Sequence, residues 1–239
     1  MTSQDLPEPR TDDEYRAEPE RSHGRRVRRR YGIGADIAAL AAQHGAIVRT
    51  FSRSTTGTHV ERREDLRAAR QQVLDETGRI DFVVNTAGVL PRGDLDETSE
   101  ETIYAATEIN YLAPVHIAQE FFPALRETGG ALLLFTSSSY TRGRAGYSLY
   151  SSAKAAVVNL TQALSDEWAA DRVRVNCINP ERTGTPMRRK AFGDEPAQSL
   201  LDSNVVARVS LDVMLSNTTG HVIDVRKDDP FTQAAGDAS

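Results

Sequence analysis

The sequence has 239 residues, 39% of them hydrophobic and 26% charged, with a formal net charge of −5 at pH 7. The length allows one domain with a full core, while the acidic balance argues against a general nucleic-acid-binding protein. The single cysteine excludes an internal disulfide and a cysteine-based metal site, and no metal is expected. The sequence has no apolar run of about 20 residues, which predicts a cytoplasmic protein without a membrane partner.

Residues 1–23 are polar, acidic and without periodicity, so we expect a disordered tail. Gly32, Ile33 and Gly34 then precede an alanine-rich helical pattern, and residues 46–51 predict a strand. This order is typical of the helix and second strand of a dinucleotide-binding βαβ unit. The N-terminus of its helix would face a pyrophosphate.

The segment before Gly32 does not fit the first strand of such a unit. Residues 24–30 hold five arginines, where a central parallel strand should be apolar. Three explanations stay open: the upstream segment comes from a misassigned coding sequence, the protein has lost cofactor binding, or the arginines form a basic edge that faces phosphate. The domain itself is expected to span residues 24–226.

Arg53 follows the predicted second strand at the place where such folds choose between cofactors. An acidic residue there binds the ribose hydroxyls of NAD, whereas an arginine accommodates the additional phosphate of NADP. NADP(H) is therefore favoured over NAD(H), and the plain alternative is a solvated loop arginine. Residues 58–61 predict a short third strand, and residues 63–77 predict a helix.

An apolar strand ends in the turn Asn85-Thr86-Ala87-Gly88, whose small residues let the backbone approach a ligand closely. Ser99 is expected to begin a long helix that runs to about Arg126. Asn110 lies within this helix, and Pro114 should kink it.

The apolar run 131–135 predicts a buried strand, followed by a loop that begins with Ser137 and a helix from Ser148 to about residue 169. Tyr150 and Lys154 are four residues apart and so share one face of that helix. An ammonium group beside a phenol should lower the pKa of the tyrosine from about 10, which makes the pair a candidate general acid and base. A serine hydroxyl at the strand end could stabilise a developing alkoxide.

The C-terminal part continues the α/β pattern. Residues 171–178 predict a strand, residues 196–216 a helix and residues 219–225 a closing strand. A flexible tail is expected from residue 227 to residue 239.

In combination, these motifs resemble the short-chain dehydrogenase/reductase family over about residues 31–225. The resemblance implies a doubly wound, three-layer parallel α/β sheet (Rossmann-like) with a degraded first strand, and hydride transfer between a nicotinamide and a carbonyl or alcohol carbon. The catalytic residues that it implies are Asn110, Ser137, Tyr150 and Lys154. The implied cofactor-binding residues are Gly32, Ile33, Gly34, Arg53, Asn85, Ala87, Gly88, Tyr150, Lys154, Pro180, Thr183 and Thr185.

The sequence departs from the family pattern at three positions. Arg28 replaces the first glycine of the phosphate-binding motif, His59 replaces an aspartate near the adenine, and Glu181 replaces the glycine after Pro180. In the family, the helix that bears Asn110 and the helix that bears the catalytic tyrosine pack across a subunit interface, so a homodimer or homotetramer is expected.

Residues 181–196 are similar to the reductase half of two-part enzymes that join a sugar-phosphate cytidylyltransferase to a short-chain reductase. This similarity suggests a keto-sugar phosphate as the small-molecule carbonyl or alcohol substrate, and the transferase activity is expected to come from elsewhere. The residues that would bind its phosphate are Arg142, Arg144, Arg188, Arg189 and Lys190, unless they are solvated lid residues. The alternatives are a non-catalytic relative that serves in dimerisation or regulation, and an epimerase or dehydratase.

Overall fold

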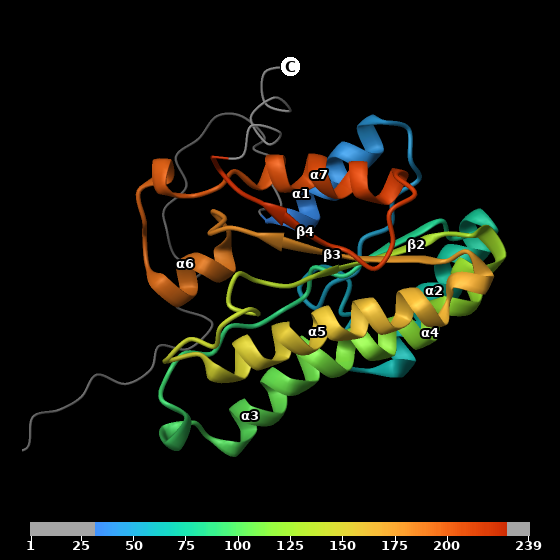
Figure 1. Ribbon diagram of the computed structural model, residues 1–239. Helices are drawn as coiled ribbons and strands as arrows, with labels where there is room; N and C mark the ends of the chain where they lie inside the picture. The colour runs from blue at the N-terminus through green and yellow to red at the C-terminus, as the bar shows by residue number, and fades with distance from the viewer. Residues whose placement is uncertain (1–31, 229–239) are drawn as a thin grey trace, which may run out of the picture.

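A four-stranded parallel sheet lies between two layers of helices (Figure 1). The computed structural model describes residues 32–228, so the predicted N-terminal tail, the arginine-rich segment and the end of the C-terminal tail lie outside the described residues. The strands are β1 (Phe82–Val84), β2 (Ala131–Phe135), β3 (Arg174–Pro180) and β4 (Val222–Val225), and they are adjacent in that order. The predicted α/β class is confirmed.

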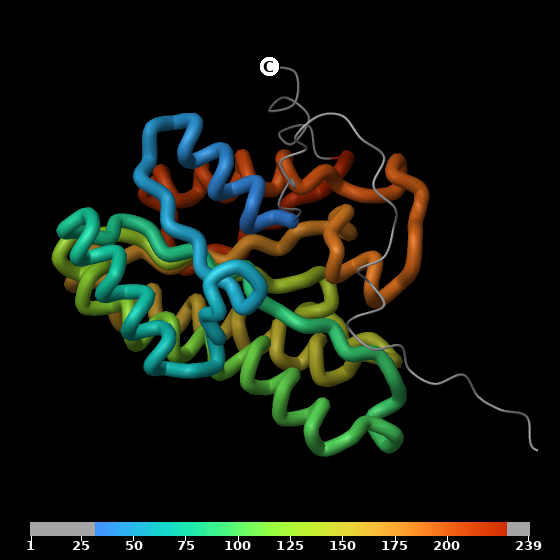
Figure 2. Tube along the Cα trace, turned by 180° about the vertical axis from the view of Figure 1, so that it is seen from behind, coloured from blue at the N-terminus to red at the C-terminus, as the bar shows by residue number. Residues whose placement is uncertain are grey.

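Helices cover both faces of this sheet. The α-helices are α1 (Ile33–Gln43), α2 (Arg63–Thr77), α3 (Glu100–Thr107), α4 (Ala113–Thr128), α5 (Ser148–Glu167), α6 (Pro186–Phe192) and α7 (Ser203–Leu215). Helices α1 and α7 lie on one face, and α2, α4 and α5 lie on the other, as the two opposite views show (Figures 1 and 2). Within the described chain, no helix has the length and apolar character that a membrane span requires.

Strand β2 separates two hydrophobic cores. Leu132 and Leu134 pack into the core beneath α2, α4 and α5, whereas Leu133 and Phe135 pack into the core beneath α1 and α7. This alternation follows from the two-residue period of a strand. Every residue of β2 is buried, as a central strand covered on both faces requires.

The strand predicted at residues 46–51 is wrong, because this segment is irregular in the structure. Its Ile47 is 72% exposed. A strand is stable only beside hydrogen-bonded neighbours, and the sheet of the described residues ends at β1, where Phe82 is 41% exposed. The predicted third strand at residues 58–61 is also absent, and a turn precedes α2 there.

The long helix predicted from Ser99 is interrupted by a π-helical turn at Glu108–Leu112. Ser99 caps α3, since its side chain accepts a hydrogen bond from Thr102 N. The interruption lies where Pro114, near the start of α4, has no N–H to offer the carbonyl of Asn110. The predicted kink therefore takes the form of a π-turn, a feature frequent at functional sites.

The segment after β3 holds one helix more than predicted. Helix α6 begins after Thr185, whose side chain accepts a hydrogen bond from Arg188 N, and Pro186 occupies its first turn. Helix α7 starts only at Ser203, after its N-cap Asp202. Helix α6 thus stands next to the carboxyl end of the sheet (Figure 1).

Candidate active site

The predicted catalytic residues meet where the carboxyl end of β2 faces the first turns of α5. Helix α5 packs on β2 and β3, so its N-terminal half lies beside the loop that leaves Phe135. Thr136 strengthens this junction, because its buried hydroxyl donates a hydrogen bond to the carbonyl of Lys154 (2.7 Å). The junction fixes the catalytic helix against the strand end.

Ser137 and Tyr150 are brought together at this junction. The side chain of Ser137 lies close enough to the buried hydroxyl of Tyr150 to lower the pKa of that phenol, against the effect of burial. Ser139 supports this arrangement, since its backbone N–H and its hydroxyl both donate to Ser137 Oγ, over 3.4 and 3.3 Å. Because Ser137 Oγ accepts both of these bonds, its own hydroxyl proton can be donated to an oxygen atom next to Tyr150.

Lys154 is buried beside the same phenol. Its Nζ donates a hydrogen bond to the carbonyl of Phe135 (2.9 Å) and lies 5.6 Å from the centre of the Tyr150 ring. An ammonium group has three N–H donors, so two remain for groups in the site. The carbonyl of Phe135 thus holds the cation at the strand end.

The electrostatics of the pair differ from the sequence-based expectation. Burial raises the pKa of Tyr150 to about 12, the hydrogen bond with Ser137 opposes this rise, and the nearby Tyr147 adds to it. Burial also lowers the pKa of Lys154 to about 8. The ammonium lies over the phenol ring and binds a backbone carbonyl, while loss of solvent disfavours both charged forms. Tyr150 is therefore a protonated acid at neutral pH.

Asn110 is fully buried and binds the loop that follows β1. Its Oδ1 accepts from Val89 N (3.0 Å), and its Nδ2 donates to the Val89 carbonyl (2.9 Å). A Cβ atom on Gly88 would lie 3.2 Å from this Oδ1 and 3.8 Å from Lys154 Nζ. The side chain of Asn110 thus positions the turn after β1.

The N-terminus of α1 packs against the same turn. Gly32 is the N-cap residue with φ of +123°, and no side chain caps the helix. The carbonyl of Gly32 accepts from the Ala35 and Asp36 N–H groups, which leaves the N–H groups of Ile33 and Gly34 without an intrahelical acceptor. A side chain at Gly34 would collide with the hydroxyl of Thr86. These small residues and open amides fit a pyrophosphate, although Asp36 adds a negative charge to the first turn.

The remaining predicted cofactor residues lie on three separate segments. Asn85 Oδ1 accepts from Ala87 N (3.1 Å), which shapes the turn after β1. Thr183 follows Pro180 and donates from its hydroxyl to the carbonyl of Glu181 (2.7 Å). The carboxylate of Glu181 accepts from Lys227 N (3.0 Å), so this departure from the family pattern is bound to the segment after β4.

Arg53 lies in an exposed turn before α2. Burial raises the pKa of Glu61, but a backbone hydrogen bond, His59 and the charge of Arg53 together lower it. Arg53 is therefore near a carboxylate on the irregular side of the sheet.

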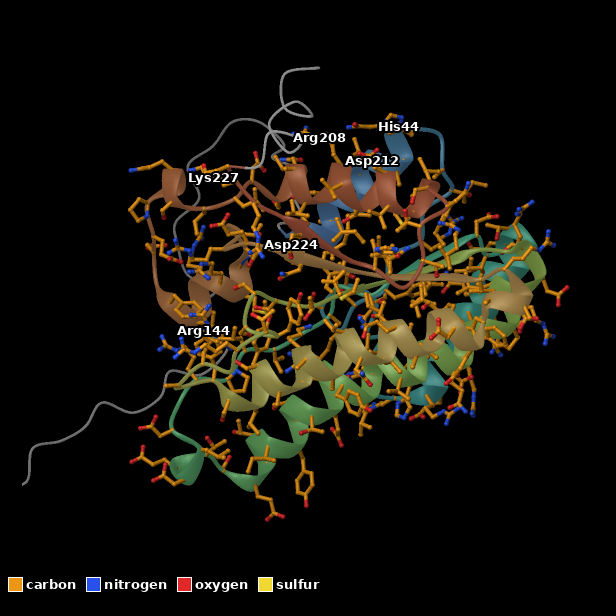
Figure 3. All side chains as sticks on the ribbon, in the orientation of Figure 1. His44, Arg144, Arg208, Asp212, Asp224 and Lys227 are labelled. Carbon is orange, nitrogen blue, oxygen red and sulfur yellow. The ribbon has the colours of Figure 1, made fainter. Side chains whose placement is uncertain are left out.

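The predicted substrate-binding cations differ in their surroundings. Arg188 forms a two-point ion pair with Glu195 (2.6 and 2.8 Å). Arg189 is 76% exposed, 3.3 Å from Asp194. Lys190 on α6 and Arg142 in the loop before α5 are exposed. Arg144 lies at the same end of the molecule, near α6 and the start of α5 (Figure 3).

Sequence reasoning missed an aromatic cluster beside Tyr150. Tyr147 meets Tyr150 edge-on, with ring centres 6.4 Å apart, and meets Phe192 at 6.0 Å. Arg92 lies over the Phe192 ring, and its Nη1 donates to the carbonyl of Ala191 (3.2 Å) across 99 residues of sequence. No local pattern signals a contact between loops so far apart.

A family model described as short chain dehydrogenase matches residues 32–196. The chain is 48% identical, over 195 residues, to the bifunctional ribulose 5-phosphate reductase/CDP-ribitol pyrophosphorylase of Haemophilus influenzae; the match covers 82% of this chain but 41% of that protein. This chain therefore corresponds to less than half of that relative, and the predicted similarity to the reductase part of a fused enzyme is confirmed.

Solved structures agree with this assignment. A short-chain dehydrogenase from Burkholderia cenocepacia, in complex with NADP, has a TM-score of 0.74 and 26% identity, covering 82% of this chain and 92% of that one. A 3-ketoacyl-(acyl-carrier-protein) reductase from Brucella melitensis, complexed with NADH, has a TM-score of 0.76 and 22% identity with the same coverage and shares the fold. The chain belongs to the short-chain dehydrogenase family, and it is an oxidoreductase that acts on alcohol or carbonyl groups, as the motifs predicted.

Proposed function

We propose that this protein uses NADPH to reduce the carbonyl group of a keto-sugar phosphate, with ribulose 5-phosphate as the first substrate to test. The observation that carries the proposal is the group formed by the half-buried Ser137 and the buried Tyr150 and Lys154 at the carboxyl edge of the sheet. The substrate class is taken from the Haemophilus influenzae relative, whose name specifies a ribulose 5-phosphate reductase.

NADP(H) would be held by the residues around the carboxyl ends of the strands, and its nicotinamide would supply or accept the hydride. The N-terminal amides of α1 and the turn after β1 would bind the phosphates and ribose, with Thr183 and Thr185 near the nicotinamide. Arg53 would accept the additional phosphate of NADP. The Burkholderia cenocepacia structure in complex with NADP supports NADP(H) as the cofactor.

Tyr150 would donate its hydroxyl proton to the carbonyl oxygen as negative charge develops there. Its raised pKa keeps the proton in place until the substrate arrives. Ser137 would donate a hydrogen bond to the same oxygen, because Ser139 already supplies the donors to Ser137 Oγ. The two hydroxyls would thus fix the carbonyl before reduction.

Lys154 would stabilise the phenolate that remains after proton transfer. It is held over the ring by Phe135, and the ammonium would return a proton through water to the phenol. The backbone carbonyl of Asn110 would hold such a water, while its side chain keeps Val89 in place. These roles assign one function to each residue of the predicted catalytic set.

The proposal also includes an oligomeric state and a location. A homodimer or homotetramer would form through α4 and α5, and a cytoplasmic location stays a prediction. The non-catalytic alternative has no support among the relatives, which are named as reductases or dehydrogenases.

The proposal is tested by titrating the protein with NADPH and following cofactor fluorescence, then by measuring NADPH oxidation with ribulose 5-phosphate and simple ketones. Tyr150→Phe should lower kcat by about 10²- to 10⁴-fold without loss of NADPH binding. Tyr104→Phe, on the exposed face of α3, is the matched control. No NADPH binding at millimolar concentration, or full turnover in Tyr150→Phe, would contradict the proposal.

A further inference from the structure

Two arginines lie over one phenylalanine ring beside the catalytic helix. The Cζ atoms of Arg92 and Arg188 are 4.7 and 4.6 Å from the centre of the Phe192 ring. Tyr147 meets the same ring edge-on and also meets the Tyr150 ring edge-on. A continuous set of ring contacts therefore connects the proton donor to these cations.

The two arginines differ in charge. The guanidinium of Arg188 is neutralised by its two-point ion pair with Glu195. Arg92 binds only the carbonyl of Ala191 and the Phe192 ring, and within residues 32–228 no carboxylate forms an ion pair with it. Asp94 and Glu97 line the same hollow of about 350 Å³ as Arg92 and Tyr147 without pairing with it. Arg92 thus keeps its full positive charge and free N–H donors.

Arg92 is also held in place before any substrate arrives. The N–H of Gly93 donates to the carbonyl of Gly146 (3.0 Å), which joins the loop after β1 to the loop before α5. A Cβ atom on Gly146 would lie 3.8 Å from Arg92 Nη2. Three segments, including α6 through Ala191 and Phe192, therefore fix the position of this cation, and a group fixed in advance binds with less loss of entropy.

We propose that Arg92 is a specificity-determining residue that binds the phosphate group of the substrate, while Arg188 holds α6 in place through Glu195 and Phe192. This inference rests on the proposed function. A free guanidinium offers paired N–H donors that match the oxygens of a phosphate monoester. The contacts from Tyr150 to Tyr147 and from Tyr147 to Phe192 together span on the order of 10 Å. This length suits a short sugar phosphate whose carbonyl group lies at Tyr150 and whose phosphate lies at Arg92.

The other candidate cations lack one of these properties. Arg189 is solvated and paired with Asp194. Arg142 and Arg144 are exposed, and among the described residues no contact orders their guanidinium groups. They can contribute to a positive field at this end of the molecule, but among these described arginines near α6 it is Arg92 that combines an unneutralised charge with a fixed position.

The test compares two substrates that differ only in the phosphate, ribulose 5-phosphate and ribulose. In Arg92→Gln, the ratio of kcat/KM for ribulose 5-phosphate to that for ribulose should fall by about 30- to 300-fold, and Arg92→Lys should recover part of the loss. Arg126→Gln is the matched control, because Arg126 is also an exposed arginine over a phenylalanine ring, at the far end of α4. Its ratio should stay within about threefold of the wild-type value.

An unchanged ratio in Arg92→Gln, with both substrates affected equally, would show that Arg92 only holds α6 and would overturn the inference. Inorganic phosphate separates this inference from the proposed function. If the wild-type protein reduces neither sugar, the proposed function fails. A rise in Tm with inorganic phosphate that disappears in Arg92→Gln would still support an anion site at Arg92. An equal rise in Tm in the two proteins, or no rise in either, would overturn the inference about Arg92.

Discussion

The central strand β2 and the edge strand β1 differ in how completely the rest of the described chain pairs with them and covers them. Strand β2 has a neighbour on each edge and helices on each face, and all of its residues are buried. Strand β1 has a neighbour on one edge in the described part of the chain, and the segment that should extend the sheet beyond it is irregular, with Ile47 exposed. The catalytic groups stand on the β2 side of the sheet, and Arg53 stands on the β1 side.

This difference separates the placement of the catalytic groups from the binding of the dinucleotide. The position of Ser137, Tyr150 and Lys154 is fixed by β2 and α5, so proton transfer does not require a complete sheet. Binding of a dinucleotide also requires the loop at Arg53, which is exposed and has fewer packing constraints. We therefore expect substitutions on the β2 side to have large effects and those beyond β1 to have small ones.

The largest expected contrast is in stability. Leu134→Ala removes a fully buried side chain from the core beneath α4 and α5, and should lower the free energy of unfolding by about 3 to 5 kcal/mol. Phe82→Ala, on the open strand, should lower it by about 1 kcal/mol, because the side chain is already 41% exposed. Urea unfolding followed by circular dichroism measures both, and equal losses would contradict the contrast.

Removing the buried cation should stabilise the protein while it abolishes turnover. The pKa of Lys154 is about 8 in the folded protein against 10.5 ordinarily. Below pH 8 the lysine is charged in both states, but the unfolded state binds its proton more tightly, so the buried charge lowers the stability of the folded protein. Lys154→Met should therefore raise the free energy of unfolding at pH 7 by about 1 to 3 kcal/mol. The gain should shrink as the pH rises from 8 toward 10.5, since wild-type Lys154 then loses its charge in the folded state first.

Lys227→Met is the control for this prediction, because Lys227 is exposed beyond β4. Its stability should follow the wild-type protein across the same pH range. A Lys154→Met protein that is less stable than wild type at pH 7 would show that the hydrogen bond to Phe135 outweighs the cost of burying the charge.

The same contrast explains how much the sequence could predict. The run from Ala131 to Lys154 was predictable because a buried strand, a serine loop and a helix each have a local pattern, and their order brings the residues together. The strand at residues 46–51 was not, since an apolar run becomes a strand only when a neighbour pairs with it. The raised pKa of Tyr150 depends on burial, and the Arg92 contact with α6 depends on tertiary packing, so neither leaves a local signal.

An intermediate effect is expected at the turn that joins the two sides. In Gly88→Ala the new methyl group would lie 3.2 Å from Asn110 Oδ1, a crowded distance, and 3.8 Å from Lys154 Nζ. The hydrogen bonds between Asn110 and Val89 should weaken, with a loss of about 1 to 2 kcal/mol in stability and about tenfold in kcat/KM. Gly143→Ala, where nothing lies within 4 Å of the added atom, is the matched control; equal stability of the two variants would argue against the crowding.

The smallest effect is expected beyond β1, at Arg53. Arg53→Gln removes the charge that would accept the phosphate of NADP, but Arg53 lies in an exposed turn where water screens it and Glu61 competes for it. The ratio of NADPH to NADH affinity should therefore fall by only about three- to tenfold, with kcat for the phosphorylated sugar unchanged once the cofactor is saturating. Fluorescence titration with both cofactors measures this ratio. A loss of a hundredfold or more would mean that the turn is ordered around the cofactor as firmly as Tyr150 is held on α5, and the division of the sheet into a fixed catalytic side and a weakly constrained cofactor side would then be wrong.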